Sequence, residues 1–410
     1  MNKTTETKSN QVKTLHSLLD PQEIQAEMMN RCKEAALKMG ITLLEEEVNA
    51  LCGASFSRKS EDQCYRGGTE KTKIIVGGAK SSIIRPRVRK DGKEVEITML
   101  NKLQEQDLLD EKIQNYMLSG ISTRNYNTLV DGYSDKLGIS KSSVSRAFIR
   151  ESKKDLEAIN ESVLSEHRFV ALFVDSFEIF GRAMVVALGV TTVMKKVILG
   201  IREGNSENSE IVTDLLSSIK ARQFTLAAPV FLAIVDGSKA LRKAINSVFG
   251  DSALIQRCWI HKLRNIKKYI PDKYHGTLHW RMKKLMNLES FDEAAKELQS
   301  LAKWLSEISH AALVSLEESG NDLLTLHALG IKGKLRQKFS TTNIIESIIS
   351  VARSKINRVK KWSPSSNQSL RWTASALFHH KTKFRCVVRS DYGNLLISAL
   401  NNYKIVKLAA

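Results

Sequence analysis

Cysteine is scarce in this chain and never paired in the sequence. Its five residues are scattered, and none forms the C-x-x-C spacing that redox and zinc-binding pairs use. This pattern indicates neither a disulfide framework nor a four-ligand zinc site, and it predicts a reduced, cytosolic compartment. The residues are Cys32, Cys52, Cys64, Cys258 and Cys386.

Long apolar runs are also missing. The most apolar stretches, FVALFV at 169–174 and AMVVALGV at 183–190, fall far short of the roughly 20 residues that a membrane-spanning helix needs. The first residues, MNKTTETKSNQVKTLHSLL, contain no apolar signal-peptide core. Proline occurs only five times, which favours short or helical connections between domains. We therefore expect no membrane partner.

Acidic residues are nearly absent from one long segment. Residues 331–390 contain 14 Lys and Arg against one acid, Glu346, so this segment alone has a net charge of +13. The whole chain has a net charge of +19 and a pI near 9.6, whereas its hydrophobic fraction of 42% and charged fraction of 26% are those of a soluble globular protein. Such a field favours a polyanionic partner, above all nucleic acid.

At 410 residues the chain has room for two to four domains, and residues 1–105 form the first expected region. Apolar residues at three- and four-residue spacing predict a helix from Pro21 that ends at Gly40. In residues 83–100, alternating apolar and charged residues flank Asp91-Gly92, which predicts a basic β-hairpin. This hairpin is either a solvated surface feature or a DNA-contacting module.

Residues 106–160 have the spacing of a helix-turn-helix. In SDKLGISKSSVSRAF, one helix stops at Gly138 and Ser140 caps a second helix whose Val144 and Phe148 face inward. Helical hairpins that bind nothing can show the same spacing. In a DNA-binding module, the second helix would present these residues to a DNA groove: Lys141, Ser142, Ser143, Ser145 and Arg146.

Residues 161–261 change to a pattern of strands. Three β-rich runs with very short connections predict an antiparallel meander, at 167–180, 182–194 and 195–203. A helix, a fully apolar strand, a second helix and a fifth strand follow, at 206–224, 229–238, 238–250 and 252–260. The predicted fold class is therefore α/β. Residues 262–335 are helical throughout, and residues 336–410 complete the chain with a basic tail.

Three carboxylates stand out in this arrangement. Asp175 and Asp236 each follow an apolar run at the expected end of a strand, where open α/β sheets gather their ligands, although such residues often only form turns or cap helices. Glu346 lies on a predicted helix, on a polar stripe beside its isoleucine face, or forms an ordinary surface ion pair. Together these three groups would form an oxygen-rich site for Mg²⁺, with Mn²⁺ as a substitute.

The order of these strands and the strings QRCWIHKLRNIKKYIP (256–271) and STTNIIESIISVARSK (340–355) resemble the bacterial Mutator-like insertion-sequence transposases. The resemblance covers at least residues 167–380. It implies a DDE enzyme with an RNase H-like core interrupted by an all-helical insertion, 262–335, and preceded by the helical and helix-turn-helix DNA-binding regions. It also implies that Asp175, Asp236 and Glu346 are the catalytic metal ligands.

The resemblance assigns further residues. Cys258 and His261 match the family's C/D-x-x-H signature, where they either organise the active site or contact DNA, or form a purely structural pair. Trp304 matches the insertion's functional tryptophan. The chain departs from the family in having Ser238-Lys239-Ala240-Leu241 after the second Asp-Gly, which leaves the carboxylates untouched. Backbone contacts to DNA are expected from Lys262, Arg264, Asn265, Arg353 and Lys355, although a basic helix is also commonly just a solvated face.

The predicted function is DNA transposition. The enzyme would bind the terminal inverted repeats of its own element, cleave there, and join the resulting 3′-hydroxyl to target DNA as a dimer or larger assembly associated with the bacterial nucleoid. Two alternatives remain open at this stage: a catalytically silent DNA-binding regulator derived from a transposase, and an RNase H-like nuclease or resolvase. The sequence leaves the repeat sequence, the target preference and the strand-transfer pathway undefined.

Overall fold

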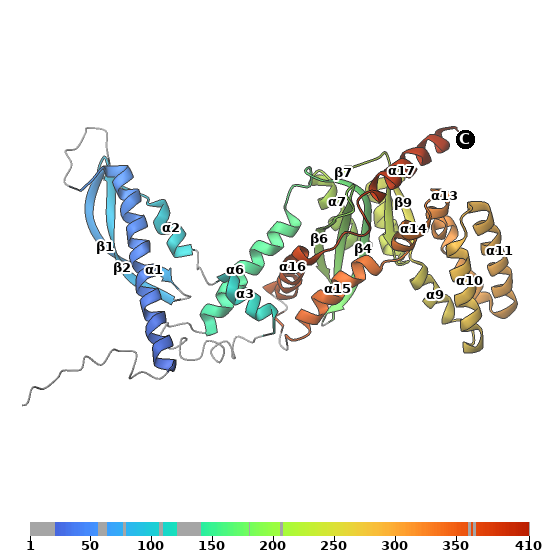
Figure 1. Ribbon diagram of the computed structural model, residues 1–410, viewed down its shortest axis with the longest axis horizontal. Helices are drawn as coiled ribbons and strands as arrows, with labels where there is room; N and C mark the ends of the chain where they lie inside the picture. The colour runs from blue at the N-terminus through green and yellow to red at the C-terminus, as the bar shows by residue number, and fades with distance from the viewer. Residues whose placement is uncertain are drawn as a thin grey trace, which may run out of the picture. The chain divides into compact units, whose positions relative to one another are not determined.

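The computed structural model describes residues 21–55, 64–76, 79–105, 110–120, 141–179, 181–205, 208–359, 362–363 and 366–409. The chain divides into two compact units, residues 1–151 and 152–410, which are treated separately (Figure 1). Each unit has its own apolar core. None of the helices in the described ranges combines the length and apolar character needed to cross a membrane.

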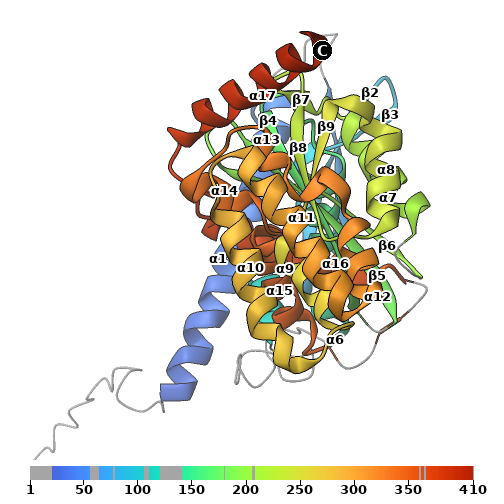
Figure 2. The same ribbon diagram turned by 90° about the vertical axis from the view of Figure 1, so that its right-hand side faces the viewer.

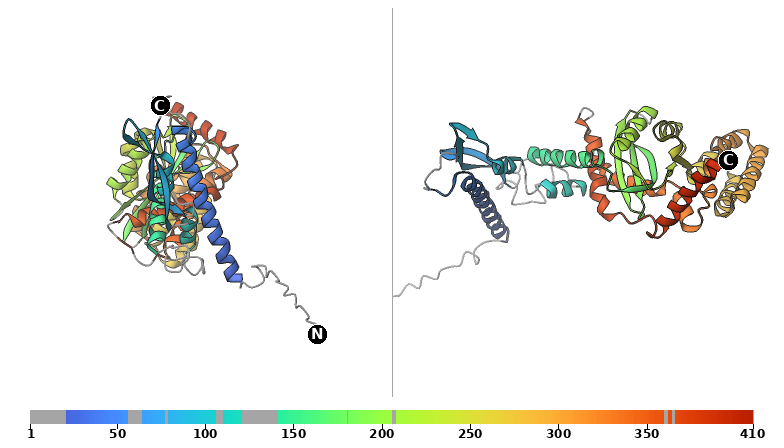
Figure 3. Two further views of the ribbon diagram at one scale, coloured as in Figure 1. Left: turned by 90° about the vertical axis from the view of Figure 1, so that its left-hand side faces the viewer. Right: turned by 90° about the horizontal axis from the view of Figure 1, so that it is seen from above.

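The first unit packs a long helix against a small antiparallel sheet (Figure 3). The sheet order is β1-β2-β3, and the elements are α1 (Pro21–Cys52), β1 (Tyr65–Val76), β2 (Ala79–Lys90), β3 (Lys93–Val95) and α2 (Thr98–Glu105). Asp91 and Gly92 both have positive φ, 50° and 77°, as a two-residue hairpin turn requires, so the predicted hairpin is confirmed. The longer β1–β2 hairpin was not predicted.

Helix α1 does not end at Gly40, as the sequence had indicated, but continues to Cys52. Gly40 lies where the helix approaches the sheet: a Cβ atom there would lie 3.2 Å from Cδ1 of Ile74. The glycine therefore marks close packing inside a helix, and this packing offsets the helix-weakening effect that the prediction relied on.

The expected helix-turn-helix is only partly described. Its first helix and turn, including Gly138 and Ser140, lie outside the described residues, which resume with α6 (Lys141–Asn160) after α3 (Asp110–Leu118). Within α6, Val144 and Phe148 are buried as predicted. Of the proposed groove-facing residues, Ser142, Ser145 and Arg146 are exposed, whereas the side chains of Lys141 and Ser143 are outside the described set.

The second unit is built on one mixed sheet, in the order β6-β5-β4-β8-β9. The first three strands form the predicted antiparallel meander, and β8 and β9 continue the sheet in parallel to β4. The short strand β7 also pairs with β4. The bounds are β4 (Arg168–Ile179), β5 (Arg182–Thr191), β6 (Lys196–Gly204), β7 (Thr225–Leu226), β8 (Phe231–Val235) and β9 (Ala253–Arg257).

Helices cover both faces of this sheet (Figure 2). On one face, Leu172 and Val174 of β4 join an apolar core with α7 (Ser209–Ala221) and α8 (Lys239–Phe249), whose caps are Asn208 and Ser238. Because side chains alternate along a strand, Phe173, Asp175 and Phe177 belong to the other face. There the Phe173 ring lies 5.8 Å from the ring of Phe339, which ends α14 (Gly333–Phe339).

The segment between β9 and α14 is helical, as predicted, and has a core of its own. Its helices are α9 (Trp259–Lys267), α10 (His275–Asn287), α11 (Phe291–Ile308), α12 (His310–Glu317) and α13 (Thr325–Ala328), with 3₁₀ turns at Asp272–Tyr274 and Gly320–Leu323. This core contains Leu278, Leu301 and Leu316, and none of its members belongs to the core under the sheet.

The chain then returns to the sheet through α15 (Asn343–Ile356), α16 (Gln368–His380) and α17 (Tyr392–Ala409). The apolar face predicted for α15 is confirmed, because Ile345, Ile348, Ile349 and Ala352 are all buried. Arg353 on the same helix places its guanidinium carbon 5.2 Å from the centre of the Phe177 ring in β4. The face of β4 that carries Asp175 is therefore the face on which α15 packs.

Candidate active site

Asp175 lies inside β4 rather than at the end of a strand, as the sequence had suggested, because β4 continues to Ile179. Its side chain points to the face covered by α14 and α15 and is 8% exposed. The backbone N–H of Ser176 donates a 2.9 Å hydrogen bond to its Oδ1. A carboxylate this deeply buried keeps its charge at a cost that hydrogen bonds and nearby positive charge offset.

Asp236 follows the last residue of β8, where the sequence placed it. Its Oδ1 accepts hydrogen bonds from the backbone N–H groups of Gly237 (2.5 Å) and Ser238 (2.8 Å), so the loop after the strand fixes the carboxylate. Gly237 has a φ of 147°, and a Cβ atom there would lie 2.5 Å from Nη2 of the buried Arg257. Only glycine fits this loop without displacing either the backbone or the guanidinium group.

Glu346 lies in the first turn of α15, with its side chain one-third exposed (33%). The hydroxyl of Thr342, the residue just before α15, donates a 2.5 Å hydrogen bond to its Oε1. The helix begins here because Thr342 leaves the helical backbone conformation while its carbonyl accepts from the N–H of Glu346. The first-turn position also suits a carboxylate, because the unpaired N–H groups there favour negative charge.

The fold brings the three carboxylates close enough to interact electrostatically. Burial, together with the negative charges of Asp236 and Glu346, raises the pKa of Asp175 to about 7, against the hydrogen bond from Ser176 and the nearby His261. Mutual repulsion of this kind is what a bound divalent cation relieves, and carboxylate oxygens are the donors that Mg²⁺ and Mn²⁺ prefer. The chemistry of the donor set therefore fits such an ion.

A second set of donors meets at Glu346. The hydroxyl of Thr342 lies 3.3 Å from Sγ of Cys258 and 3.2 Å from Nδ1 of His261, and the Thr342 N–H also donates to Sγ at 3.4 Å. A hydroxyl has one proton to donate, and its shortest contact is to Glu346. The arrangement is therefore a relay in which His261 donates to Thr342 and Thr342 donates to Glu346.

The residues of this relay also shift one another's pKa values. Burial alone raises the pKa of the Cys258 thiol, but hydrogen bonding with His261 and Thr342 outweighs it and holds that pKa below its usual range. Hydrogen bonding with Cys258 raises the pKa of His261; burial opposes this, and the nearby charges of Cys258, Glu346 and Asp236 add to it. The two pKa values therefore shift in opposite directions, and both shifts involve the contact between Cys258 and His261.

Cys258, His261 and Glu346 are also the one group of three or more Cys, His, Asp and Glu donors in the described ranges whose ligand atoms lie within 4.8 Å of one another. Asp175 and Asp236 lie outside this set. Because Cys258 is fully buried and its sulfur lies against Thr342, whose backbone N–H donates to it, it cannot contact DNA. Among the predicted alternatives, the structure favours a Cys–His pair that organises Glu346.

The residues predicted to contact the DNA backbone fall in different places. Arg264 and Arg353 are exposed, and Asn265 and Lys355 are half-buried. Lys355 follows Glu346 by nine residues, or two and a half helical turns, and so lies on the opposite side of α15. Arg353 follows Glu346 by seven residues and lies on the same side, so only Arg353 of these two shares a surface with the carboxylates.

Lys262 requires a correction. Its side chain is 0% exposed, and its ammonium group donates to the carbonyl of Ser315 and lies 3.1 Å from Oε2 of Glu318. It therefore has no surface to offer a phosphate and instead ties α9 to α12. Trp304 is half-buried in the helical core, where its ring lies 6.0 Å from that of Tyr274.

Two residues that shape the site were not singled out from the sequence for these roles. Thr342 was quoted only within the string at 340–355, although it joins Cys258 and His261 to Glu346. Arg257 was not considered; it is buried beneath Gly237, with Nη2 at 3.6 Å from Glu318. The TTN-x-x-E spacing, which puts a threonine one turn before a glutamate, was the available signal for Thr342.

Comparison with known proteins agrees with this architecture. The sequence pattern of the family described as "Transposase, Mutator family" matches residues 4–384. The chain is 27% identical, over 60% of its length and 76% of the relative, to the transposase for insertion sequence element IS6120 of Mycolicibacterium smegmatis. It is 24% identical, over 82% of its length and 87% of the relative, to the transposase for IS256 in transposon Tn4001 of Staphylococcus aureus.

A transposase for insertion sequence element ISRM5 of Rhizobium meliloti is 25% identical, over 75% of this chain and 77% of that protein. Because the family pattern covers nearly the whole chain, the molecule belongs to a class of DNA-mobilising proteins. Specifically, the chain belongs to the Mutator family of transposases.

Proposed function

We propose that this chain is a DDE transposase that cleaves the ends of its insertion sequence and joins them to target DNA. Asp175, Asp236 and Glu346 would hold Mg²⁺, or Mn²⁺ in its place, against the DNA backbone. The observation that carries the proposal is the electrostatic coupling of these carboxylates, which come from β4, the loop after β8 and α15, in a member of a transposase family.

The strand order supports an RNase H-like core. Three antiparallel strands followed by two parallel strands, β6-β5-β4-β8-β9, carry Asp175 on the central strand and Asp236 after its parallel neighbour. The helical segment 262–335, with its separate core, would be an insertion between Asp236 and Glu346. The expected core segments, 161–261 and 336–410, then meet where α15 packs on β4.

The proposed reaction has two phosphoryl-transfer steps. Water attacks the phosphorus at the element's end, and the bond to the 3′ oxygen breaks to leave a 3′-hydroxyl. That hydroxyl then attacks a target phosphate, forming one P–O bond as the target's P–O bond breaks. Bound divalent ions would stabilise the charge on the attacking and leaving oxygens. Thr342, in contact with His261, holds Glu346, and the N–H groups of Gly237 and Ser238 hold Asp236.

DNA binding would involve both units. The helix-turn-helix region, 106–160, would bind the terminal inverted repeats, and the exposed Arg264 and Arg353 would contact the backbone near the carboxylates. Two element ends must be processed together, so the working form would be a dimer or a larger assembly on the bacterial nucleoid. The net charge of +19 supports a polyanionic partner.

The decisive experiment compares Glu346→Gln with wild type in cells. The gene is placed on a plasmid with its native flanking noncoding DNA, and excised circles and new insertions are counted. Glutamine keeps the shape and removes the charge, so both products should disappear. Glu317→Gln is the matched control, because Glu317 is exposed on α12 of the helical segment. Joined products from Glu346→Gln would overturn the proposal.

Two other outcomes would identify the alternatives. If wild type protects the flanking ends but neither protein yields cleaved or joined DNA, the chain is a regulator. If wild type cuts branched DNA in a Mg²⁺-dependent manner without joining, it is a nuclease or resolvase. The intact set of three carboxylates favours the transposase over the regulator.

A further inference from the structure

Positive side chains gather on the second unit at a place that the proposed function does not use. They come from the start of β6, from α14, from the C-terminal end of α15 and the residues after it, and from the C-terminal end of α16 and the 3₁₀ turn at Lys381–Lys383. Three of them are exposed and three are half-buried. These six residues are called the basic surface: Lys196, Lys338, Lys355, Arg358, His380 and Lys383.

The segment after α16 brings these charges together. The Val387 N–H donates a 2.9 Å hydrogen bond to the Met194 carbonyl, so this segment lies against the turn that leads into β6. The ring of Phe384 then contacts two members of the basic surface, because Nζ of Lys196 is 5.9 Å from its centre and the centre of the His380 ring is 5.5 Å away. Phe384 thus joins the charge at the start of β6 to the charges at the end of α16.

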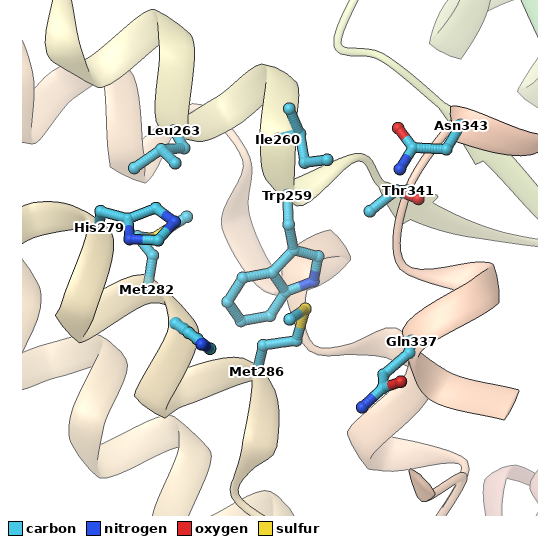
Figure 4. Close-up of a pocket in the computed structure, with 10 residues that line it drawn as sticks. Trp259, Ile260, Leu263, His279, Met282, Met286, Gln337, Thr341 and Asn343 are labelled. Atoms are coloured by element: carbon cyan, nitrogen blue, oxygen red, sulfur yellow. The ribbon is translucent and has the colours of Figure 1, made fainter. Parts of the chain in front are cut away.

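Lys338 reaches the same surface because of its place on α14. Neighbouring residues on a helix point about 100° apart. Gln337 lines a pocket with Trp259 and Met286, as Figure 4 shows. Lys338 is exposed, and its positive charge acts on Lys196 instead. The basic surface therefore extends from α14 to β6.

The charges of the basic surface repel one another. Burial and then the positive charge of Lys338 lower the pKa of Lys196. Burial likewise lowers the pKa of His380, and so do the charges of Lys383 and Lys355. Among the described residues, Lys196, Lys338 and Lys383 form no ion pair with an acidic group. A polyanion that lies across the group would relieve this repulsion.

The basic surface and Glu346 lie on different sides of α15. Lys355 follows Glu346 by two and a half helical turns and so belongs to the opposite side of the helix. Its pKa is lowered by burial and then by the charges of Lys383 and Arg358, which places Lys355 within the basic surface. A helix with its side chains is about 10 Å thick, whereas one turn of duplex DNA is about 34 Å long. A duplex at the carboxylates is therefore long enough to reach the basic surface as well.

We propose that the basic surface binds the target DNA to which the element's end is joined. The inference rests on the proposed function, which brings two DNA molecules to one site and places the element's end beside Arg264 and Arg353. Terminal repeats have a defined sequence and must be read through their bases, whereas ammonium groups bind phosphates as point charges whatever the sequence. Four of the six members are lysines, so the basic surface suits the DNA whose sequence need not be defined.

The test measures how the affinity for a second duplex depends on salt. Full-length protein is first saturated with a duplex of its own terminal repeat and then titrated with a fluorescent duplex of unrelated sequence at several salt concentrations. Each phosphate contact contributes about 0.9 to the slope of log affinity against log salt. The triple variant Lys196→Gln/Lys338→Gln/Lys383→Gln should therefore reduce this slope by about two to three and leave the affinity for the terminal repeat unchanged.

The matched control removes three charges elsewhere, as Lys243→Gln/Lys296→Gln/Lys303→Gln. These lysines lie on α8 and α11, and two are exposed and one is half-buried, as in the triple variant. Both variants lose the same net charge, so only local contacts distinguish them, and the control should keep the wild-type slope. Equal urea midpoints establish that the variants are folded. The double variant Lys338→Gln/Lys383→Gln changes exposed side chains only and should reduce the slope by about two.

The outcomes separate this inference from the proposed function. An unchanged salt slope in the triple and double variants, or an equal loss of affinity for the terminal repeat and the unrelated duplex, would overturn the assignment to target DNA alone if wild type still excises and inserts its element in cells. A wild-type protein that yields neither excised circles nor insertions would overturn both.

Discussion

Replacing Asp175 with asparagine should stabilise the metal-free protein, although it removes a group proposed to be essential. Asparagine has the same shape and keeps a carbonyl oxygen for the Ser176 N–H, but it does not ionise. The carboxyl group is buried and close to two other acids, which raises its pKa from 3.8 to about 7. Ionising it therefore costs more in the folded protein than in the unfolded chain.

The sign and size follow from this pKa. Below pH 3.8 the carboxyl group of Asp175 is neutral in both the folded and the unfolded state and has no effect on stability. Between pH 3.8 and about 7 this group loses its proton in the unfolded chain but keeps it in the folded protein, so the folded state becomes progressively less stable as the pH rises. A difference of about three pKa units corresponds to about 4 kcal/mol above pH 7. This is the expected gain in unfolding free energy for Asp175→Asn at about pH 8.5, and it should vanish near pH 4.

Urea unfolding of the metal-free protein at both pH values measures this difference. A loss of stability in Asp175→Asn at about pH 8.5 would refute the argument from burial and repulsion. Adding Mg²⁺ tests the metal proposal separately. Wild type should gain unfolding free energy with rising Mg²⁺ concentration at about pH 8.5, whereas the asparagine variant should not. An absent Mg²⁺ response in wild type would contradict the metal assignment while leaving the pH argument intact.

Three further substitutions test single contacts. Thr342→Val removes the hydroxyl bonded to Glu346 and should lower excision about tenfold, because a hydrogen bond to a charged, partly hydrated group contributes about 1.5 kcal/mol. Thr342→Ser keeps the hydroxyl and should keep activity. Equal excision by the two variants would contradict the relay. Gly237→Ala should lower the unfolding free energy by about 1–3 kcal/mol in urea and reduce excision, because its Cβ meets Arg257; an unchanged midpoint would count against this packing. Lys262→Met should lower stability by about 1–3 kcal/mol but leave the salt dependence of DNA affinity unchanged, and a shallower salt slope would restore Lys262 as a phosphate contact.

The elements of the second unit were predictable because their sequence patterns are strong. The apolar run before Asp236 is typical of a strand buried on both faces, and β8 is completely buried. The isoleucines of α15 repeat at helical spacing and lie on one face, as expected. In such segments the local pattern and the tertiary packing favour the same structure, so a single sequence was sufficient.

The predictions failed where tertiary packing changed the meaning of a residue. A glycine such as Gly40 often marks the end of a helix, but here its lack of a side chain allows close packing against Ile74. Lys262 has the sequence context of a solvated basic helix, yet its ammonium group is paired with Glu318, 56 positions away. No local pattern contains information about a partner that distant.

The side-chain relay at Glu346 could not be predicted from the sequence for the same reason. The two strings that contain Cys258 and Thr342 were recognised separately, but their contact spans 84 positions and depends on how the helical segment returns the chain to the sheet. Sequence reasoning could therefore name the carboxylates and the Cys–His pair, and the structure was needed to connect them.

Strand β4 also has two parts, which differ in the number of strands that they pair with. Residues Ala171 to Phe173 pair with β5 on one side and β8 on the other, whereas the residues beyond them, including Asp175, pair with β5 alone. Amide hydrogens in the doubly paired part should exchange with solvent only on global unfolding, and those of Asp175 to Ile179 through smaller local openings. Asp175 thus stands just outside the part of β4 that is paired on both sides.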